Sequence, residues 1–135
     1  MAFHRTADNP MYGVLGIIRE DGRLLMIQRS RFVRVPLAWC FPGGEVERGE
    51  TQEAALVREM REEVHLEVTP GELLMTQTKH DGALVLYCWS AHIVSGTPKA
   101  NPREINDVRW MTPAEIRVQP GLLPGTTEIL DTIGL

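Results

Sequence analysis

Three carboxylates spaced about one helical turn apart are the residues of this sequence best suited to chemistry. Glu59, Glu62 and Glu63 stand at i, i+3 and i+4, so in a helix, which turns about 100° per residue, they share one face. Carboxylates held this close repel one another at neutral pH. Oxygen ligands without imidazole or thiolate suit Mg²⁺ or Mn²⁺ rather than Zn²⁺. A divalent cation would relieve the repulsion and could hold a phosphate group.

A second interpretation is a solvated helix face on which glutamates pair with Arg58 and Arg61, because runs of charge are usually exposed to solvent. Two features favour the metal site. The arginines are displaced around the helix from the edge that Glu59 and Glu63 form, so we do not expect them to neutralise it cleanly. A Gly-Gly turn at 43–44 leads into the helix and could offer backbone carbonyls to the same edge.

The carboxylates need a helix to hold them, and the sequence predicts one from Thr51 onward. Ala, Leu, Met, Glu, Arg and Gln dominate this stretch, and no Gly or Pro occurs before Pro70. Leu56, Met60 and Val64 form an apolar stripe at i, i+4 and i+8 beside the acidic face. We expect this stripe to pack on a core.

The whole segment resembles the Nudix box, G-x5-E-x7-R-E-U-x-E-E-x-G-U, in which U is an apolar residue. Gly44, Glu50 and the run 58–66 (REMREEVHL) match every defined position except one. The departure is His65, which replaces the late glycine of the box. A glycine there fits a helix end with positive φ, and a histidine adopts that conformation at some cost in strain. Phe41-Pro42-Gly43, in front of the box, is also frequent in the family.

The resemblance implies roles for the matching residues. In Nudix hydrolases the matching glutamates bind the metal, and one of them can also act as the base, so it assigns Glu59, Glu62 and Glu63 to the metal. Glu59 or Glu62 is the expected base, and the choice stays open. The carbonyl of Gly43 or Gly44 could complete the metal shell.

Two further acidic residues fit around this set. An ion pair between Glu50 and Arg58 would brace the turn against the helix and so orient the catalytic glutamates, and the alternative is two unconnected surface charges. Some family members carry a metal-binding or basic carboxylate at the relative position of Glu104. The alternative for Glu104 is a solvated loop glutamate.

Basic residues gather after the second expected strand, at Arg29, Arg31 and Arg34. The guanidinium group suits phosphate oxygens, and nucleoside-triphosphate members of the family often have an arginine where Arg29 falls. We therefore expect Arg29, together with the Gly43 and Gly44 backbone, to bind substrate.

Aromatic and histidine residues give weaker indications. Trp39, Phe41 and Tyr87 could stack on a base, but aromatics in strands are more often core, and we favour core. The four histidines are too scattered along the sequence for a metal site; they are His4, His65, His80 and His92.

Composition limits the class of protein. With 135 residues, 43% hydrophobic and 24% charged, the chain is expected to form one domain, residues 1–135, with a real core. A net charge of −4 does not favour a nucleic-acid polymer or a membrane surface as partner. No apolar run approaches the roughly 20 residues of a membrane span, and the first residues lack a signal peptide's apolar core. Cys40 and Cys88 are expected to be buried free thiols in a cytoplasmic protein.

The expected fold class is α/β. Residues 1–10 are expected to form a loose lead-in. Two turns are expected, a hairpin turn at 20–22 and a turn at 79–82. Two loops are expected, an exposed one at 30–37 and a polar one at 98–106. A capping box at 112–115 starts a short helix, and 125–133 predicts a terminal helix capped by Thr126 or Thr127. Strands are expected at 12–19, 24–29, 39–41, 66–68, 73–78, 83–94 and 108–111. Periodicity indicates a mixed sheet covered by helices, and the resemblance implies a Nudix-type α/β/α sandwich with the box as a loop–helix–loop.

The resemblance also implies a reaction. Divalent cations cancel the charge that protects a phosphoanhydride and activate a bound water. The family hydrolyses a nucleoside diphosphate linked to another group, and a compact chain of this kind is most similar to MutT-like nucleoside-triphosphate pyrophosphohydrolases, which release a monophosphate and pyrophosphate. The alternatives are an ADP-sugar or dinucleoside-polyphosphate hydrolase and a non-catalytic nucleotide sensor. The sequence leaves the base of the nucleotide, and the choice between monomer and homodimer, open.

Overall fold

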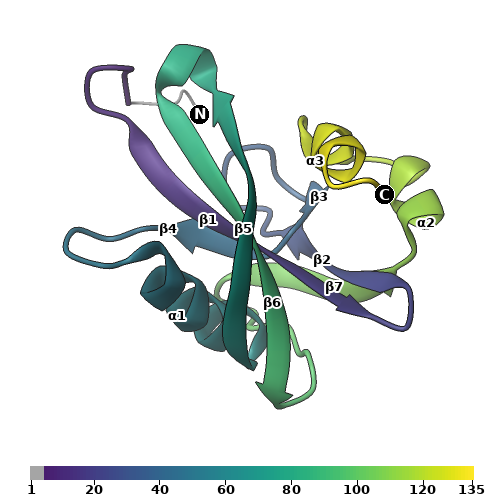
Figure 1. Cartoon of the computed structure of the whole chain (residues 1–135). Helices are drawn as coiled ribbons and strands as arrows, with labels where there is room; N and C mark the ends of the chain where they lie inside the picture. Colours follow the sequence, from purple (N-terminus) through teal and green to yellow (C-terminus); the bar gives the residue numbers. More distant parts are fainter. Residues whose placement is uncertain (1–4) are drawn as a thin grey trace.

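A computed structural model describes residues 5–135, so His4 and the other residues of the expected lead-in before residue 5 lie outside the described residues. Within this range the chain forms seven strands, three α-helices and one 3-10 turn (Figure 1). In chain order they are β1 (Met11–Glu20), β2 (Arg23–Arg29), β3 (Trp39–Cys40), β4 (Gly43–Glu45), α1 (Gln52–Val64), β5 (Glu67–Lys79), η1 (His80–Gly82), β6 (Leu84–Ser95), β7 (Ile105–Met111), α2 (Pro113–Arg117) and α3 (Thr126–Thr132).

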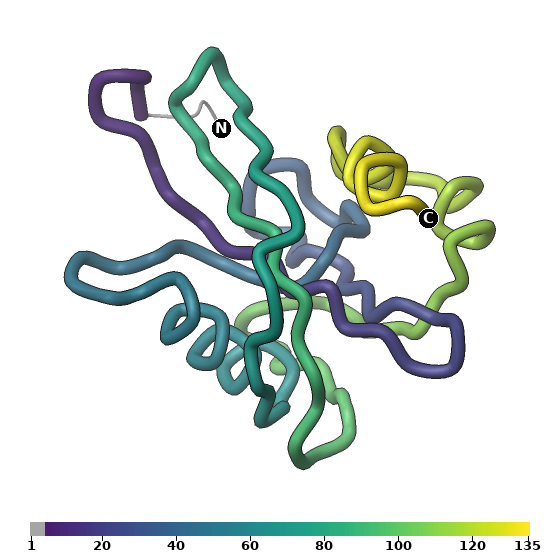
Figure 2. Tube along the Cα trace, in the orientation of Figure 1, coloured from purple at the N-terminus to yellow at the C-terminus, as the bar shows by residue number. Residues whose placement is uncertain are grey.

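The strands form one mixed sheet with β1 at its centre. The main order is β3-β2-β1-β6-β5, while β4 also pairs with β1, and β7 pairs with β2. β1 runs parallel to β6 over eight residues and antiparallel to β4 at Gly13–Leu15. The beginning of β1 therefore lies beside the tip of the β5–β6 hairpin, as the trace in Figure 2 shows. This arrangement places the short strand β4, which precedes helix α1 in the chain, directly against the central strand β1.

Alternating side chains of the central strands create two cores, one on each face of the sheet. Ile18 and Leu25 belong to the core that contains α1, whereas their neighbours Ile17 and Leu24 belong to the core that contains α2 and α3. Successive residues of a strand point to opposite faces, so each strand serves both layers. The result is a sheet between helices, with α1 on one side and α3 on the other (Figure 1). The expected α/β/α sandwich is confirmed.

Helix α1 begins and ends where its residues predict. Thr51 adopts an extended conformation and its hydroxyl accepts a hydrogen bond from the Ala54 N–H at 3.1 Å, which is the usual N-cap. The predicted stripe Leu56, Met60 and Val64 is fully buried. His65 ends the helix with φ 58° and ψ 37°, so the histidine accepts the left-handed conformation for which the box normally uses glycine.

Several expected boundaries were wrong. Residues 43–45 form a strand, β4, rather than a Gly-Gly turn, because β1 offers them a free edge. β5 is one bulged strand, since Pro70 and Gly71 sit at a register shift instead of ending it. β7 starts at Ile105, within the expected loop. The terminal helix has Gly125 as its N-cap without a side-chain hydrogen bond, and the Thr126 hydroxyl donates back to the Leu123 carbonyl instead.

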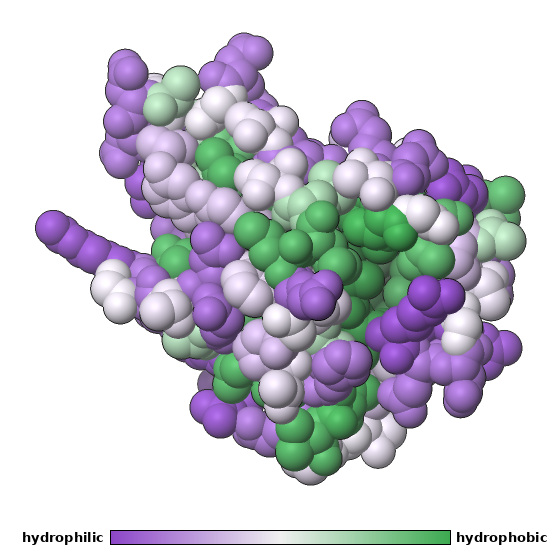
Figure 3. All heavy atoms as spheres, viewed as in Figure 1, coloured by the Kyte–Doolittle hydropathy of each residue, from purple (hydrophilic) through white to green (hydrophobic). Residues whose placement is uncertain are grey.

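Both apolar and polar side chains are exposed on the face of the molecule seen in Figure 1. In the space-filling view, apolar side chains gather in the middle of one face and polar side chains surround them (Figure 3). Among the described residues, no helix is both long and apolar enough to cross a bilayer.

Candidate active site

One large cavity lies at the junction of β1, β4, α1 and the strands β5 and β6. Its volume is about 940 Å³, and its walls include the carboxylates of Glu45, Glu59, Glu63 and Glu104. Glu59 and Glu63 reach it from α1, while Glu104 reaches it from the loop before β7. The structure therefore brings three of the predicted metal-site glutamates to one cavity.

Glu63 is the most deeply placed of these carboxylates. Its residue is 8% exposed, and its Oε1 accepts a hydrogen bond from the Gly43 N–H at 3.0 Å. Burial raises its pKa from 4.5 to about 8, and the negative charges of Glu59 and Glu104 act in the same direction. A carboxyl group in this environment favours its protonated form, and a cation placed beside it would reverse that preference.

Glu59 lies directly against Gly44, and this contact explains why position 44 has no side chain. A Cβ added to Gly44 would lie 2.5 Å from Glu59 Oε1, far inside the contact distance of two such atoms. A Cβ on Gly43 would collide with the Val14 carbonyl. Burial raises the pKa of Glu59, and the Arg58 guanidinium partly opposes the rise. The two glycines thus let β4 fit between β1 and the acidic face of α1.

Arg58 links the loop to the helix. Its Nε and Nη2 donate to the two carboxylate oxygens of Glu50 at 2.7 and 2.8 Å, and Nη2 also donates to the Glu45 carbonyl at 2.9 Å. The predicted Glu50–Arg58 ion pair is confirmed. The bidentate bond lowers the pKa of Glu50 to about 2 and raises the pKa of Arg58.

Arg58 also contacts the acidic face itself. Its Nη1 lies 2.8 Å from Glu59 Oε1 and 3.3 Å from Glu62 Oε2. The expectation that the arginines would not cleanly neutralise the edge of Glu59 and Glu63 was therefore wrong at Glu59, because the long Arg58 side chain reaches this carboxylate. Arg61 points elsewhere and pairs with Glu67 at 2.6 Å.

Glu62 has a different setting from its neighbours. Its side chain is 49% exposed, and it does not line the cavity. Its backbone carbonyl accepts a hydrogen bond from Asn101 Nδ2 at 2.8 Å. The structure therefore separates Glu62, on the solvent side of Arg58, from Glu59 and Glu63, on the cavity side.

Asn101, which the sequence did not single out, explains how Glu104 reaches the cavity. The Asn101 N–H donates to the Glu63 carbonyl at 3.1 Å, so the loop is fixed to the end of α1. The Asn101 carbonyl then accepts from the N–H groups of Glu104 and Ile105 at 2.9 Å each. Asn-Pro at 101–102 is a turn signal, but it gives no indication of the helix that the turn would meet.

Basic and polar side chains also line the cavity. Arg29, Arg34, Lys79 and His80 line it together with Gln77. The Arg29 guanidinium donates to the Arg34 carbonyl through Nε at 2.9 Å and Nη2 at 2.7 Å, which holds the loop 30–37 near β2. Lys79 donates to the Pro124 carbonyl, and burial lowers its pKa.

Apolar residues of the loop 30–37 complete the wall, and the sequence analysis missed them. Phe32, Val33 and Val35 line the cavity, and Phe32 is 83% exposed. Of the aromatics considered earlier, Trp39 and Phe41 are buried in the core, as favoured. Tyr87 stacks on Tyr12 with 6.3 Å between ring centroids.

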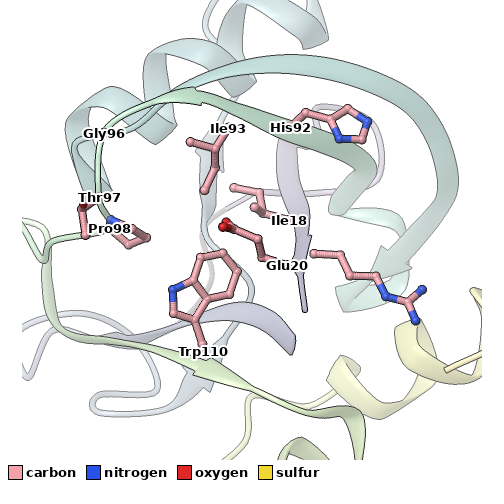
Figure 4. Close-up of a pocket in the computed structure, with 9 residues that line it drawn as sticks. Ile18, Glu20, His92, Ile93, Gly96, Thr97, Pro98 and Trp110 are labelled. Atoms are coloured by element: carbon pink, nitrogen blue, oxygen red, sulfur yellow. The ribbon is translucent and has the colours of Figure 1, made fainter. Parts of the chain in front are cut away.

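A second, smaller cavity of about 430 Å³ lies between the ends of β1 and β6 and the strand β7 (Figure 4). Ile18, Ile93 and Trp110 supply its apolar surface, and Glu20 is the one carboxylate among its lining residues. It shares no lining residue with the large cavity. The chemistry-bearing side chains therefore converge in the large cavity.

Comparison with known proteins identifies the family. The model of the NUDIX domain matches residues 9–132. The chain belongs to the Nudix family. A CTP pyrophosphohydrolase of Escherichia coli (strain K12) is 35% identical over 120 residues, which is 87% of each chain. A putative 8-oxo-dGTP diphosphatase 2 of Mycobacterium tuberculosis (strain ATCC 25618 / H37Rv) is 35% identical over 106 residues, 76% of this chain and 74% of the relative.

A solved structure agrees. The crystal structure of a MutT NUDIX hydrolase from Burkholderia pseudomallei superposes with a TM-score of 0.79 at 29% identity and covers 93% of this chain and 98% of its own. This Nudix chain is accordingly a hydrolase of phosphoanhydride bonds that acts on nucleotide derivatives, and members of the family generally need a divalent metal.

The residues of the cavity fit such a metal. The donors are carboxylate and carbonyl oxygens, which Mg²⁺ prefers. Glu59 and Glu63 both line the cavity, and burial raises the pKa of each. Within residues 5–135 no three carboxylate, histidine or cysteine side chains already converge as a ligand cluster. Glu59 and Glu62 are both paired with Arg58.

Proposed function

We propose that this Nudix hydrolase is a nucleoside-triphosphate pyrophosphohydrolase that releases a nucleoside monophosphate and pyrophosphate. The observation that carries the proposal is the composition of the large cavity. Its acidic lining residues (Glu45, Glu59, Glu63, Glu104) suit a cation, and its basic and polar lining residues (Arg29, Lys79, Gln77) suit an anionic nucleotide. A cavity of about 940 Å³ is at the large end of the size range of small-molecule sites. The name of the Escherichia coli relative supports the same class of substrate.

The proposed metal ligands are the carboxylates of Glu59 and Glu63 with the Gly44 carbonyl, joined by Glu104 and Glu62. Mg²⁺ is the expected ion, and Mn²⁺ has the same ligand preference. When bound, the ion would neutralise phosphate oxygens and lower the pKa of water. Glu104 is favoured by its place on the cavity wall, whereas Glu62 would have to leave Arg58, its partner at 3.3 Å.

The hydrolysis itself needs a base. A water oxygen bonds to phosphorus, the bond from that phosphorus to the bridging oxygen breaks, and a carboxylate accepts the proton of the water. Glu59 and Glu62 are the two candidates. Glu59 lines the cavity and Glu62 does not, so the geometry favours Glu59. Arg58 would position Glu59 through their 2.8 Å contact.

Substrate binding is assigned to Arg29 and to the backbone of Gly43 and Gly44. Arg29 lines the cavity, and its guanidinium suits a phosphate. It would act either directly or by holding the loop that carries the Arg34 carbonyl. The glycines bring the β4 backbone within reach of a ligand because neither has a side chain in the way.

The test is a hydrolysis assay over a nucleotide panel with Mg²⁺, in which the products are separated and identified. We expect nucleoside triphosphates to yield monophosphate and pyrophosphate, and Glu59→Gln and Glu63→Gln each to lower kcat/KM by at least about 100-fold. Glu53→Gln is the matched control, because Glu53 is exposed on the first turn of the same helix.

Other outcomes would refute the proposal. Preferred cleavage of ADP-sugars or dinucleoside polyphosphates would show that the substrate belongs to that class instead. Nucleotide binding without turnover would show that the protein is a sensor. Full activity in the Glu63→Gln variant would show that the assignment of Glu63 to the metal site is wrong.

We propose further that residues 1–135 act as one domain, because both cores share the central sheet. Cys40 and Cys88 are buried free thiols, and burial raises their pKa values to about 12 and about 11. Free thiols support a reducing, cytoplasmic location. Sedimentation would decide between monomer and homodimer.

A further inference from the structure

The wall of the cavity contains one buried acceptor whose partner is missing. Gln77, on β5, is 7% exposed and lines the cavity. Its Nε2 donates to the Gly125 carbonyl at 3.0 Å, while its Oε1 has no hydrogen-bond partner among residues 5–135. A buried amide oxygen without a donor is costly, so an oxygen left in this state beside a ligand cavity indicates a donor that arrives with the ligand.

The surrounding chain fixes the orientation of this amide. If the amide were rotated, its oxygen would face the Gly125 carbonyl, and two acceptors would repel. Gly125 is itself held close, because a Cβ there would lie 2.8 Å from Gln77 Nε2 and 2.9 Å from Gln77 Oε1. It also adopts φ 97°, which favours glycine. The turn before α3 therefore determines which end of the Gln77 amide is left for a ligand.

Lys79 places a donor beside this acceptor. Its Cε would lie 2.8 Å from the same Cβ position on Gly125, and its Nζ donates to the Pro124 carbonyl. Gln77 and Lys79 are i and i+2 on β5, so both side chains point to one face of the sheet. Lys79 is half-buried and also lines the cavity, so it adds a cationic donor to the surroundings of the Gln77 amide.

We infer that Gln77 is a specificity-determining residue, and that its Oε1 accepts a hydrogen bond from the exocyclic amino group of the substrate base. The inference rests on the proposed hydrolysis of nucleoside triphosphates and deepens it. Cytosine and guanine carry such an amino group, whereas uracil and hypoxanthine lack it. A site built to bond a polar group rejects the analogue that leaves its own group unpaired. A ring carbonyl or a bare C–H in place of the amino group leaves Gln77 Oε1 without a donor.

The test compares kcat/KM for two substrate pairs, CTP with UTP and GTP with ITP, in the wild type and in Gln77→Met. Guanine and hypoxanthine differ only in the 2-amino group. We expect the wild type to prefer the amino member of at least one pair by about tenfold or more. We expect Gln77→Met, which keeps the length of the side chain without its acceptor, to reduce that preference to less than about threefold.

The design separates this inference from the proposed function and from a folding defect. Each preference is a ratio measured on one protein sample, so a lower active fraction cancels. Thr78→Val is the control variant, because Thr78 is exposed on the same strand and should keep the wild-type preference. Calorimetric binding of CMP, UMP, GMP and IMP tests Gln77 without turnover.

The outcomes are distinct. Equal rates within both pairs, or a preference that survives in Gln77→Met, would overturn the role of Gln77 while leaving the proposed function intact. Absence of hydrolysis with an amino preference in the binding data would refute the proposed function and support the role of Gln77.

Discussion

The contact between Gly44 and Glu59 gives the sharpest prediction, and Gly44→Ala is the perturbation. A new Cβ would lie 2.5 Å from Glu59 Oε1, about 1 Å closer than an ordinary contact of about 3.5 Å. The Glu59 carboxylate must then shift by roughly that 1 Å, because Gly44 is held by its pairing with Val14 of β1. Gly44 does not have positive φ, so alanine adds no backbone strain of its own.

The expected magnitude follows from the shift. A misplacement of about 1 Å in a catalytic group can cost about 100-fold in rate, so we expect Gly44→Ala to lower kcat/KM for nucleoside triphosphate about 100-fold. The free energy of unfolding should change by less than about 1 kcal/mol, since the loss of unfolded-state entropy offsets part of the contact. Pyrophosphate release with Mg²⁺ measures the first quantity, and urea denaturation measures the second.

Gly49→Ala is the matched control, because nothing lies within 4 Å of a Cβ at that position. Its φ of 84° will cost some stability, but we expect hydrolysis to remain within about twofold of the wild type. If folded Gly44→Ala retained wild-type kcat/KM, the position of Glu59 would not matter for hydrolysis, and its assignment to the metal and the base would be wrong.

Three other results should follow. In EDTA, the free energy of unfolding of Glu63→Gln should rise relative to that of the wild type as pH rises from 4.5 to 8, by up to about 1.4 kcal/mol per pH unit. The reason is that folded wild type keeps the Glu63 proton that the unfolded chain loses. Urea titrations at pH 5, 6.5 and 8 measure this difference, and a difference independent of pH would contradict the raised pKa. Glu50→Gln should lower the free energy of unfolding by about 1–2 kcal/mol at pH 7. Because the pKa of Glu50 is lowered to about 2, this loss of stability should be complete above pH 4.5 and shrink as pH falls toward 2. A loss that is independent of pH would refute the charged pair with Arg58. EDTA should abolish hydrolysis and Mg²⁺ or Mn²⁺ should restore it, whereas activity in excess chelator would refute a metal-dependent reaction.

Local patterns predicted much of the structure. The apolar stripe of α1 and the start of this helix at Thr51 depend on residues of one helix, so sequence spacing alone located them. The Glu50–Arg58 pair was predictable because both residues belong to one loop–helix segment, and a guanidinium fork matches a carboxylate. The alternation of β1 and β2 determined the two cores.

Features that depend on distant segments were not predictable. β4 was expected to be a turn because the pairing that makes it a strand comes from β1, about 30 residues away. Asn101 and Gln77 gain their roles from the end of α1 and from the turn at Gly125. Single-residue propensities contain no information about such partners. The reach of Arg58 toward Glu59 was missed for a related reason, since spacing around a helix ignores the length of a flexible side chain.

The central claim is that the cavity-facing carboxylates of α1 hold a divalent cation. Titration with Mn²⁺, followed by electron paramagnetic resonance of the free ion, tests it most directly. We expect the wild type and Glu53→Gln to bind Mn²⁺ equally, and Glu59→Gln and Glu63→Gln each to weaken binding at least about tenfold. Unchanged Mn²⁺ affinity in folded Glu59→Gln and Glu63→Gln would contradict it.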